Sequence, residues 1–381
     1  MAQVELKDMR EFGKAFALTR EHYEQAIFEG GADVNRKLLK FFARNPKYKS
    51  ESRRAKVYSY MQSGGLRRRL KAYMKAAAIL TRLHAEGLVY GNFSDECVFV
   101  SEDRDCDQVR LIGIDETNFS ELSSVGFYDD CFAFAGELFR AILNRHPFDG
   151  KAFRAAVDEE EDADRLRDNG EFAWILDDED RSNDGRQFLI FEDSAMLTDG
   201  LRELFRQMFS FNACRYPIAR PTMMQLTYET AFAFDNVIRS KNCGLDYVNS
   251  KIFSICPFDH LETPSVRLKS FLLDAEDRKS AMLWQFTHES EDETIEVPLR
   301  ILNGFKCREP DEIAFILQFE NGKIYFRSAV DDCVFGFCDG VDGEESPFRS
   351  LGGFCFSQPR FSIKCRDEKN GRRILIEGEN S

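Results

Sequence analysis

The chain has 381 residues and a formal net charge of −14, and it contains no apolar run near the ~20 residues that a membrane-spanning helix needs. The acidic excess argues against a nucleic-acid surface or an anionic-membrane surface, because both need clustered positive charge. The 11 cysteines are an odd number without a framework spacing, and the N-terminus lacks the build of a signal peptide, so we expect free thiols in a cytoplasmic protein.

Residues 1–65 form the first predicted region, a polar and mainly helical segment. An apolar cluster at residues 38–42 ends at Asn45-Pro46, a pair that typically closes a helix. Its glycines at positions 30 and 31 do not form a phosphate-binding GxGxxG pattern.

Residues 66–117 predict a long helix followed by a turn and a hairpin. The helix ends at Gly87, and the apolar runs at residues 98–100 and 109–114 flank an acidic loop as two strands. The apolar face of the helix recurs at three- and four-residue spacing: Leu70, Met74, Ala77, Leu80 and Leu83.

Further helices are predicted within the segment 129–151 and from residue 197 onward. The segment 129–151 has one apolar helical face and ends in the letters HPFDGK, at residues 146–151. Between the two helices, residues 152–195 are acid-rich, a composition typical of a solvated loop.

Residues 262–381 change to strand patterns, with alternating apolar residues in TIEVPLRIL and several later runs. Asn321-Gly322 is the dipeptide that most favours a type I′ hairpin turn, and Asn370-Gly371 repeats it. The sequence therefore predicts an α+β protein, mainly helical at first and followed by an antiparallel β-sandwich or barrel.

Four segments in this order resemble bacterial Ser/Thr protein kinases of the eukaryotic-like type, in the branch marked by HPFDGK. They are HAEGLVYGNFSDECVFV, DDCFAFAGELFRAILNRHPFDGK, LTDGLRELFRQMF with ARPT, and CGLDYVNSKIFSICPFDH. The resemblance implies a kinase large lobe over residues 66–240 with an insertion at 152–195, and a degenerate zinc ribbon at 241–261. The glycine-rich loop and strand lysine of the kinase small lobe are not visible in residues 1–65.

The residues that do chemistry in that family are replaced here. Kinases use an Asp as catalytic base, an Asn for metal, and a second Asp on the metal that bridges the phosphates. The resemblance places these roles on Asn92, Cys97 and Gly113, with Asp115 as a substitute for the last one if the register shifts. An amide is not a base at neutral pH, a thiol suits magnesium poorly and glycine has no side chain, so ATP and magnesium are not expected.

Two structural residues of the family are kept. Asp130 matches a buried Asp that satisfies backbone amides of the catalytic loop, a role that survives loss of catalysis. Arg220 matches an arginine that pairs with a glutamate of the activation segment; without that glutamate, we expect it to pair with another acid or to cap a helix.

The ribbon-like segment holds the candidate metal ligands Cys243, Cys256, Asp246 and His260, with Asp259 in place of a last cysteine. These four side chains can supply the tetrahedral set that zinc needs. The alternative, which we favour, is a metal-free remnant with buried thiols.

These features predict a pseudokinase that acts as a scaffold or regulatory partner of other proteins. By the resemblance, von Willebrand factor A-type proteins and metal-dependent phosphatases are candidate partners. One alternative is an atypical kinase-fold transferase that uses Asp95, Asp115 and Glu116. Another is a plain helical adaptor with a β-sandwich cap; the kinase-like frame requires Val98 and Leu111 to lie in paired strands.

Overall fold

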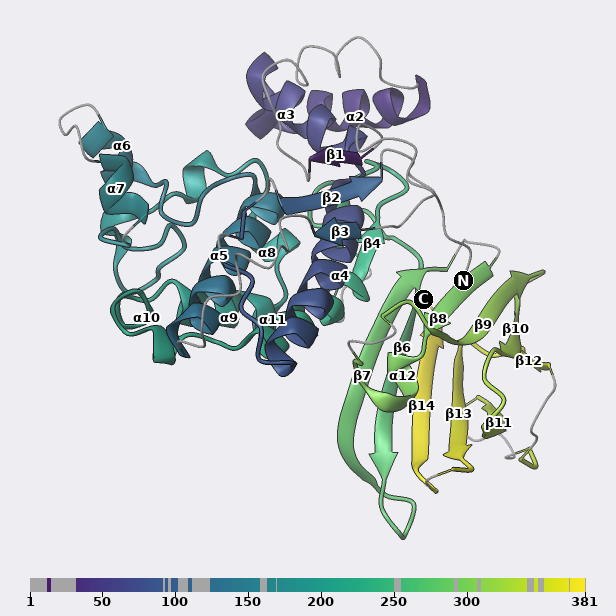
Figure 1. Ribbon diagram of the computed structural model, residues 1–381. Helices are drawn as coiled ribbons and strands as arrows, with labels where there is room; N and C mark the ends of the chain where they lie inside the picture. Colours follow the sequence, from purple (N-terminus) through teal and green to yellow (C-terminus); the bar gives the residue numbers. More distant parts are fainter. Residues whose placement is uncertain are drawn as a thin grey trace. The chain divides into compact units, whose positions relative to one another are not determined.

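The computed structural model describes residues 12–14, 32–91, 93–94, 97–101, 109–111, 124–157, 163–168, 170–249, 255–290, 294–306, 310–340, 346–348, 353–369 and 371–380. They form a mixed α and β structure with several small antiparallel sheets (Figure 1). The chain divides into two compact units, residues 1–231 with 243–245, and residues 232–242 with 246–381. The boundary between residues 231 and 232 lies inside the range 66–240, which the resemblance implies to be one domain.

The first unit is mainly helical. Its described elements are β1 (Phe12–Lys14), α2 (Ala32–Arg44), η2 (Pro46–Tyr48), α3 (Glu51–Gln62), α4 (Gly65–Ala85), β2 (Val98–Ser101), β3 (Val109–Leu111), α5 (Ser124–Leu143), α6 (Lys151–Val157), α7 (Ala163–Asp168), η4 (Arg181–Asn183), η5 (Arg186–Phe188), α8 (Asp193–Met196), α9 (Asp199–Met208), α10 (Phe211–Arg215), η6 (Pro217–Ala219) and most of α11 (Met223–Phe234).

Helix α4 is the helix predicted from the apolar face of residues 70–83, and it packs against α5 (Figure 1). Leu70, Met74, Ala77 and Leu80 are fully buried. Their spacing places them on one stripe of the helix, so the sequence pattern and the packing agree. Gly87 follows the helix with a φ of 78°, the left-handed conformation that glycine adopts at low cost.

The predicted hairpin after this helix is present. Strands β2 and β3 pair antiparallel, with Val98 opposite Leu111 and Val100 opposite Val109. Strand β1 adds to the other edge of β2, where Gly13 is opposite Val100. The sequence pattern did not predict this third strand, because residues 12–14 are too few to show a strand period.

The acidic segment 152–195 differs from the predicted solvated loop in its described part. Trp174, Ile175 and Leu176 are almost fully buried. Asn183 is also fully buried, and its side chain bonds four backbone groups: Oδ1 accepts from the amides of residues 152 and 153, and Nδ2 donates to the carbonyls of residues 148 and 173. The segment therefore has a buried, packed centre although it is rich in charged residues. Its composition alone does not reveal this centre.

The second unit is mainly β-structure. Its described elements are β4 (Val237–Arg239), β5 (Asp246–Val248), β6 (Ser265–Leu273), β7 (Lys279–Glu289), β8 (Thr294–Pro298), α12 (Arg300–Asn303), β9 (Ile313–Glu320), β10 (Lys323–Ser328), β11 (Cys333–Asp339), β12 (Phe354–Phe356), β13 (Arg360–Asp367) and β14 (Arg373–Asn380).

The strands of the second unit form antiparallel sheets in the orders β12-β10-β9-β8, β11-β13-β14-β6-β7 and β4-β5. Aromatic rings join the two larger sheets: Phe326 of β10 lies 4.9 Å from Phe337 of β11, and Phe356 of β12 lies 4.3 Å from Phe361 of β13, between ring centroids. The hairpin predicted at Asn321-Gly322 is present, since β9 and β10 pair directly across it.

The run TIEVPLRIL is a strand only in its first part. Residues 300–303 form the short helix α12 instead. This helix carries Arg300, whose guanidinium binds both carboxylate oxygens of the buried Asp235, and Trp284 Nε1 donates to the same carboxylate at 2.6 Å. An isolated buried carboxylate is costly, and these donors compensate for its burial.

None of the helices in the described ranges combines the length and apolarity needed to cross a lipid bilayer.

Candidate functional site

The candidate site lies where the C-terminal end of α4 and the turn after it meet the start of α5. Asp130 is only 1% exposed. Its Oδ2 accepts from the amide of Tyr90 at 2.7 Å, and its Oδ1 accepts from the amide of Gly91 at 2.8 Å. His84 Nε2 lies 3.0 Å from Oδ2 and completes the set.

These contacts hold the backbone directly before position 92. A carboxylate that accepts backbone amides satisfies donors that burial would otherwise leave without a partner. The Asp130 contact is the one that the resemblance implies for this residue. Asn92 itself lies outside the described residues, as do Asp95, Gly113, Asp115 and Glu116.

Cys97 is half-buried immediately before β2. Its Sγ lies 3.5 Å from Ser94 Oγ, and its amide donates to the Ser94 carbonyl at 3.1 Å. The neighbouring Tyr90 is buried, and burial together with a hydrogen bond to Cys97 raises the pKa of the phenol. The thiol therefore takes part in a local network with two neutral hydroxyl groups.

Arg220 pairs with an acid at the start of α5. Its guanidinium donates to Asp129 Oδ1 at 2.7 Å and to the carbonyls of Tyr128 and Ala213, at 3.2 and 2.9 Å. The guanidinium carbon also lies 4.5 Å from the centre of the Phe132 ring. Arg220 thus ties the loop before α11 to α5, in line with the expectation that it pairs with another acid.

The letters HPFDG, at residues 146–150, form a tight turn into α6. Asp149 accepts from Arg145 at 2.5 Å and from Arg154 at 3.2 Å, and Phe148 is buried. Asn183 Oδ1 caps the first amides of α6, as described above. The two arginines bound to Asp149 and the side chain of Asn183 thus hold the turn in place. The letters HPFDG therefore have a structural role.

Cys243 and Cys256, the two cysteines of the ribbon-like segment, are both buried. Asp246 pairs with Arg239 at 2.6 Å, and His260 is exposed. Asp259 Oδ2 lies 3.1 Å from Ser240 Oγ, which donates to it. Two of the four candidate ligands, Asp246 and His260, therefore face an ion-pair partner or the solvent.

Comparison with models of known protein families gives no match, and comparison with curated proteins gives none. The assignment of a function thus depends on the geometry of the chain itself.

Proposed function

We propose that this chain is a kinase-like protein without phosphoryl-transfer activity that acts as a scaffold or regulatory binding partner of other proteins. The observation that carries the proposal is the Asp130 carboxylate bound to the amides of Tyr90 and Gly91. It braces a loop whose next residue, position 92, is an asparagine where phosphoryl transfer needs an aspartate.

The strand pairing beyond this loop supports the same proposal. Val98 is opposite Leu111 in the β2–β3 hairpin, as the kinase-like frame requires. This pairing favours the kinase-like frame over the plain helical adaptor.

The local environment of Cys97 supports loss of the metal site. Magnesium binds oxygen ligands and gives up its water shell reluctantly, whereas Cys97 offers a thiol that already contacts Ser94. A chain with this residue at the metal position is not expected to hold Mg²⁺ and ATP together.

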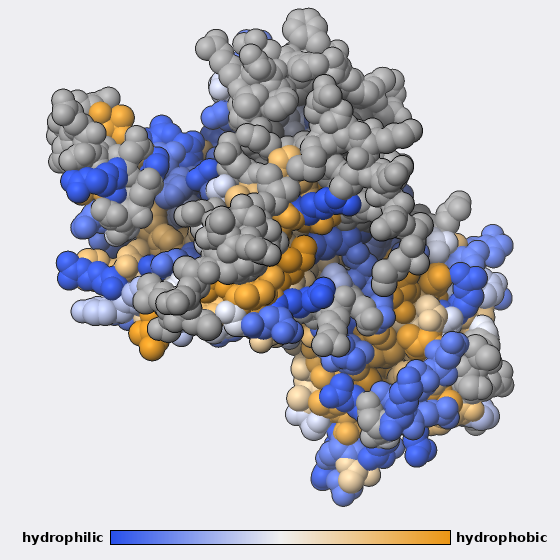
Figure 2. All heavy atoms as spheres, in the orientation of Figure 1, coloured by the Kyte–Doolittle hydropathy of each residue, from blue (hydrophilic) through white to orange (hydrophobic). Residues whose placement is uncertain are grey.

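The binding role has a candidate surface at residues 211–228, which we call the apolar patch. Five of the large apolar side chains that are exposed among the described residues lie in this short segment: Phe211 at 66%, Tyr216 at 59%, Ile218 at 80%, Met224 at 54% and Tyr228 at 40% exposure. A few apolar side chains lie among hydrophilic ones at the lower left of Figure 2. Exposed apolar side chains that cluster in this way often mark a surface that binds another protein.

Charge indicates the kind of partner that fits the apolar patch. The sequence has no acidic residue between Glu203 and Glu229, although the chain as a whole carries a charge of −14. Arg215 is exposed over the Phe211 ring, at 4.6 Å, and has no ion-pair partner in the described part of the chain. We therefore expect a protein partner that presents apolar side chains with a carboxylate opposite Arg215.

Purified full-length chain can test this surface. An aspartate at Ile218 places a charge at the most exposed apolar position, so Ile218→Asp should weaken partner capture at least tenfold. Met282→Asp is the matched control, because Met282 is equally apolar, is 54% exposed and lies in the second unit. The candidates to assay are von Willebrand factor A-type proteins and phosphatases of the native host. A partner that both variants retain equally contradicts the assignment of the apolar patch.

For the second unit we propose a β-sandwich, in which the four-stranded and five-stranded sheets pack face to face. The ring contacts of Phe326 with Phe337 and of Phe356 with Phe361 support this arrangement. For the ribbon-like segment we propose a metal-free remnant with buried thiols, because Asp246 is already paired with Arg239 and His260 is exposed, whereas a zinc site needs four ligands.

A further inference from the structure

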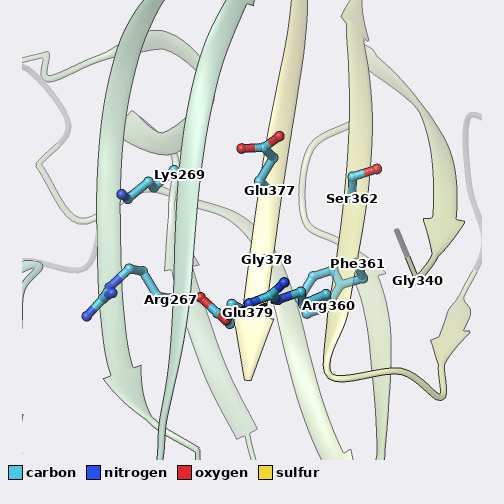
Figure 3. A pocket seen from close by; sticks show the side chains of 9 residues that line it. All are labelled: Arg267, Lys269, Gly340, Arg360, Phe361, Ser362, Glu377, Gly378 and Glu379. Atoms are coloured by element: carbon cyan, nitrogen blue, oxygen red, sulfur yellow. Dashed lines mark hydrogen bonds and ion pairs between the residues drawn. The ribbon is translucent and has the colours of Figure 1, made fainter. Parts of the chain in front are cut away.

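A cavity of about 350 Å³ lies on the five-stranded sheet of the second unit. Side chains of β6, β14 and β13, three adjacent strands, line it, and Gly340 closes one side (Figure 3). Small-molecule sites begin at about 300 Å³, so the cavity is large enough for a small metabolite.

The strand register explains why charged residues meet in this pocket. Glu379 of β14 is directly opposite Arg267 of β6 on one side and Arg360 of β13 on the other. Two residues earlier on β14, Glu377 is opposite Lys269 and Ser362. Figure 3 shows the two glutamates on the central strand, with the basic residues on the strands that flank it. Because residues two apart share a face, all these side chains lie on the same side of the sheet.

The two carboxylates are already bound to cations. Arg360 donates to Glu379 Oε1 from Nε at 3.1 Å and from Nη2 at 3.0 Å. Glu377 pairs with Lys279 of β7. Lys269 has no hydrogen-bond or ion-pair partner among the residues that the structure describes, although its directly paired neighbour is Glu377. The pocket therefore keeps a surplus of positive charge.

Arg267 is a second cation that lines the pocket. It is half-buried, and burial lowers the pKa of its guanidinium more than the nearby Glu379 raises it. Its Nη2 lies 3.4 Å from Asn249 Oδ1. A guanidinium presents several N–H donors in one plane, a geometry that suits an oxyanion.

We propose that this pocket binds a small molecule that carries a phosphate or similar oxyanion and hydroxyl groups. The oxyanion contacts Lys269, whose charge has no partner among the described residues, with the Arg267 guanidinium on the same face of β6. The hydroxyl groups donate to Glu377 and Glu379 or bond to Ser362, because two carboxylates in the same pocket would repel a ligand that carried only negative charge. The inference concerns the second unit and is independent of the function proposed above.

Three matched probes separate the parts of this proposal: glycerol 3-phosphate, inorganic phosphate and glycerol. We expect glycerol 3-phosphate to bind the full-length chain with a Kd of about 1 mM, followed by ³¹P line broadening. Phosphate should bind more weakly because it lacks the carbon-bound hydroxyl groups, and glycerol should not compete measurably because it lacks the charge.

Variants then place the binding in this pocket. Lys269→Ala should raise the Kd for glycerol 3-phosphate about tenfold, and Lys269→Arg should restore most of the affinity. Lys323→Ala is the control, because Lys323 is exposed on β10 of the other large sheet. Circular dichroism checks that each variant is folded. Equal Kd values for Lys269→Ala and Lys323→Ala, or no binding by the parent chain, would overturn the proposal.

Discussion

At the scale of single residues, the buried carboxylate of Asp130 carries the most weight. It accepts from two backbone amides and lies beside His84, so its charge is compensated although the side chain is 1% exposed. Burial without such donors would cost several kcal/mol, so the partners explain why an ionisable residue is kept there.

We predict that Asp130→Asn lowers the free energy of unfolding by about 3 kcal/mol, because the new amide nitrogen faces a backbone donor instead of accepting from it. Urea unfolding followed by circular dichroism measures the loss. The control is Asp129→Asn at the adjacent position: Asp129 is 60% exposed and pairs with Arg220, so its loss should stay within about 0.5 kcal/mol. Equal losses for both variants would contradict the bracing role of Asp130.

The thiol of Cys131, next in the chain, gives a second prediction. Burial, with a smaller contribution from Asp130, raises the pKa of this thiol to about 12. At pH 8 only about one Cys131 in ten thousand is a thiolate, so iodoacetamide should label it only after unfolding in urea. Mass spectrometry of labelled peptides measures this, and labelling at equal rates in native and unfolded protein would be incompatible with the structure.

The same shift has a consequence for stability. In the unfolded chain the thiol ionises around its ordinary pKa of 9.0, whereas in the folded chain it stays protonated. Because the unfolded state then binds fewer protons, the contribution of Cys131 to stability is present below about pH 9 and decreases above it. Cys131→Ala should remove this part of the pH dependence.

At the scale of elements, two glycines on or beside helices make a matched pair. A Cβ on Gly150, at the start of α6, would overlap the backbone carbonyl of Asn183, whereas a Cβ on Gly136, inside α5, meets no atom within 4 Å. We predict that Gly150→Ala destabilises the chain by about 3 kcal/mol and that Gly136→Ala stabilises it by about 1 kcal/mol. Thermal melting of both variants is the measurement, and effects of the same sign would contradict the packing of Asn183 against the HPFDG turn.

Local features of the fold could be predicted from the sequence. The buried face of α4 follows from a spacing within 14 residues, and the β9–β10 hairpin follows from Asn321-Gly322.

Non-local features could not be predicted. The pocket depends on β6 pairing with β14, which brings Lys269 opposite Glu377 across more than a hundred residues. Period-two alternation shows that each side chain points outward but not which strand lies beside it. The packed centre around Asn183 was missed for the same reason, since its four backbone partners lie 10 to 35 residues away.

At the scale of the whole molecule, the chain consists of a mainly helical unit that contains the buried Asp130 and a β-rich unit that contains the charged pocket. Figure 2 shows hydrophilic side chains gathered over the lower end of the strands in the second unit. The central claim, which we propose for the first unit, is that Asp130 braces a kinase-like frame whose positions for a base and two metal ligands hold Asn92, Cys97 and Gly113.

The most direct test of this claim is thermal melting of the full-length chain with and without magnesium and ATP. Ligand that binds only the folded state raises the melting temperature, so a chain without the metal site should show a shift below about 1 °C with both present, the same as with magnesium alone. A shift of several degrees that requires both ATP and magnesium would contradict the claim.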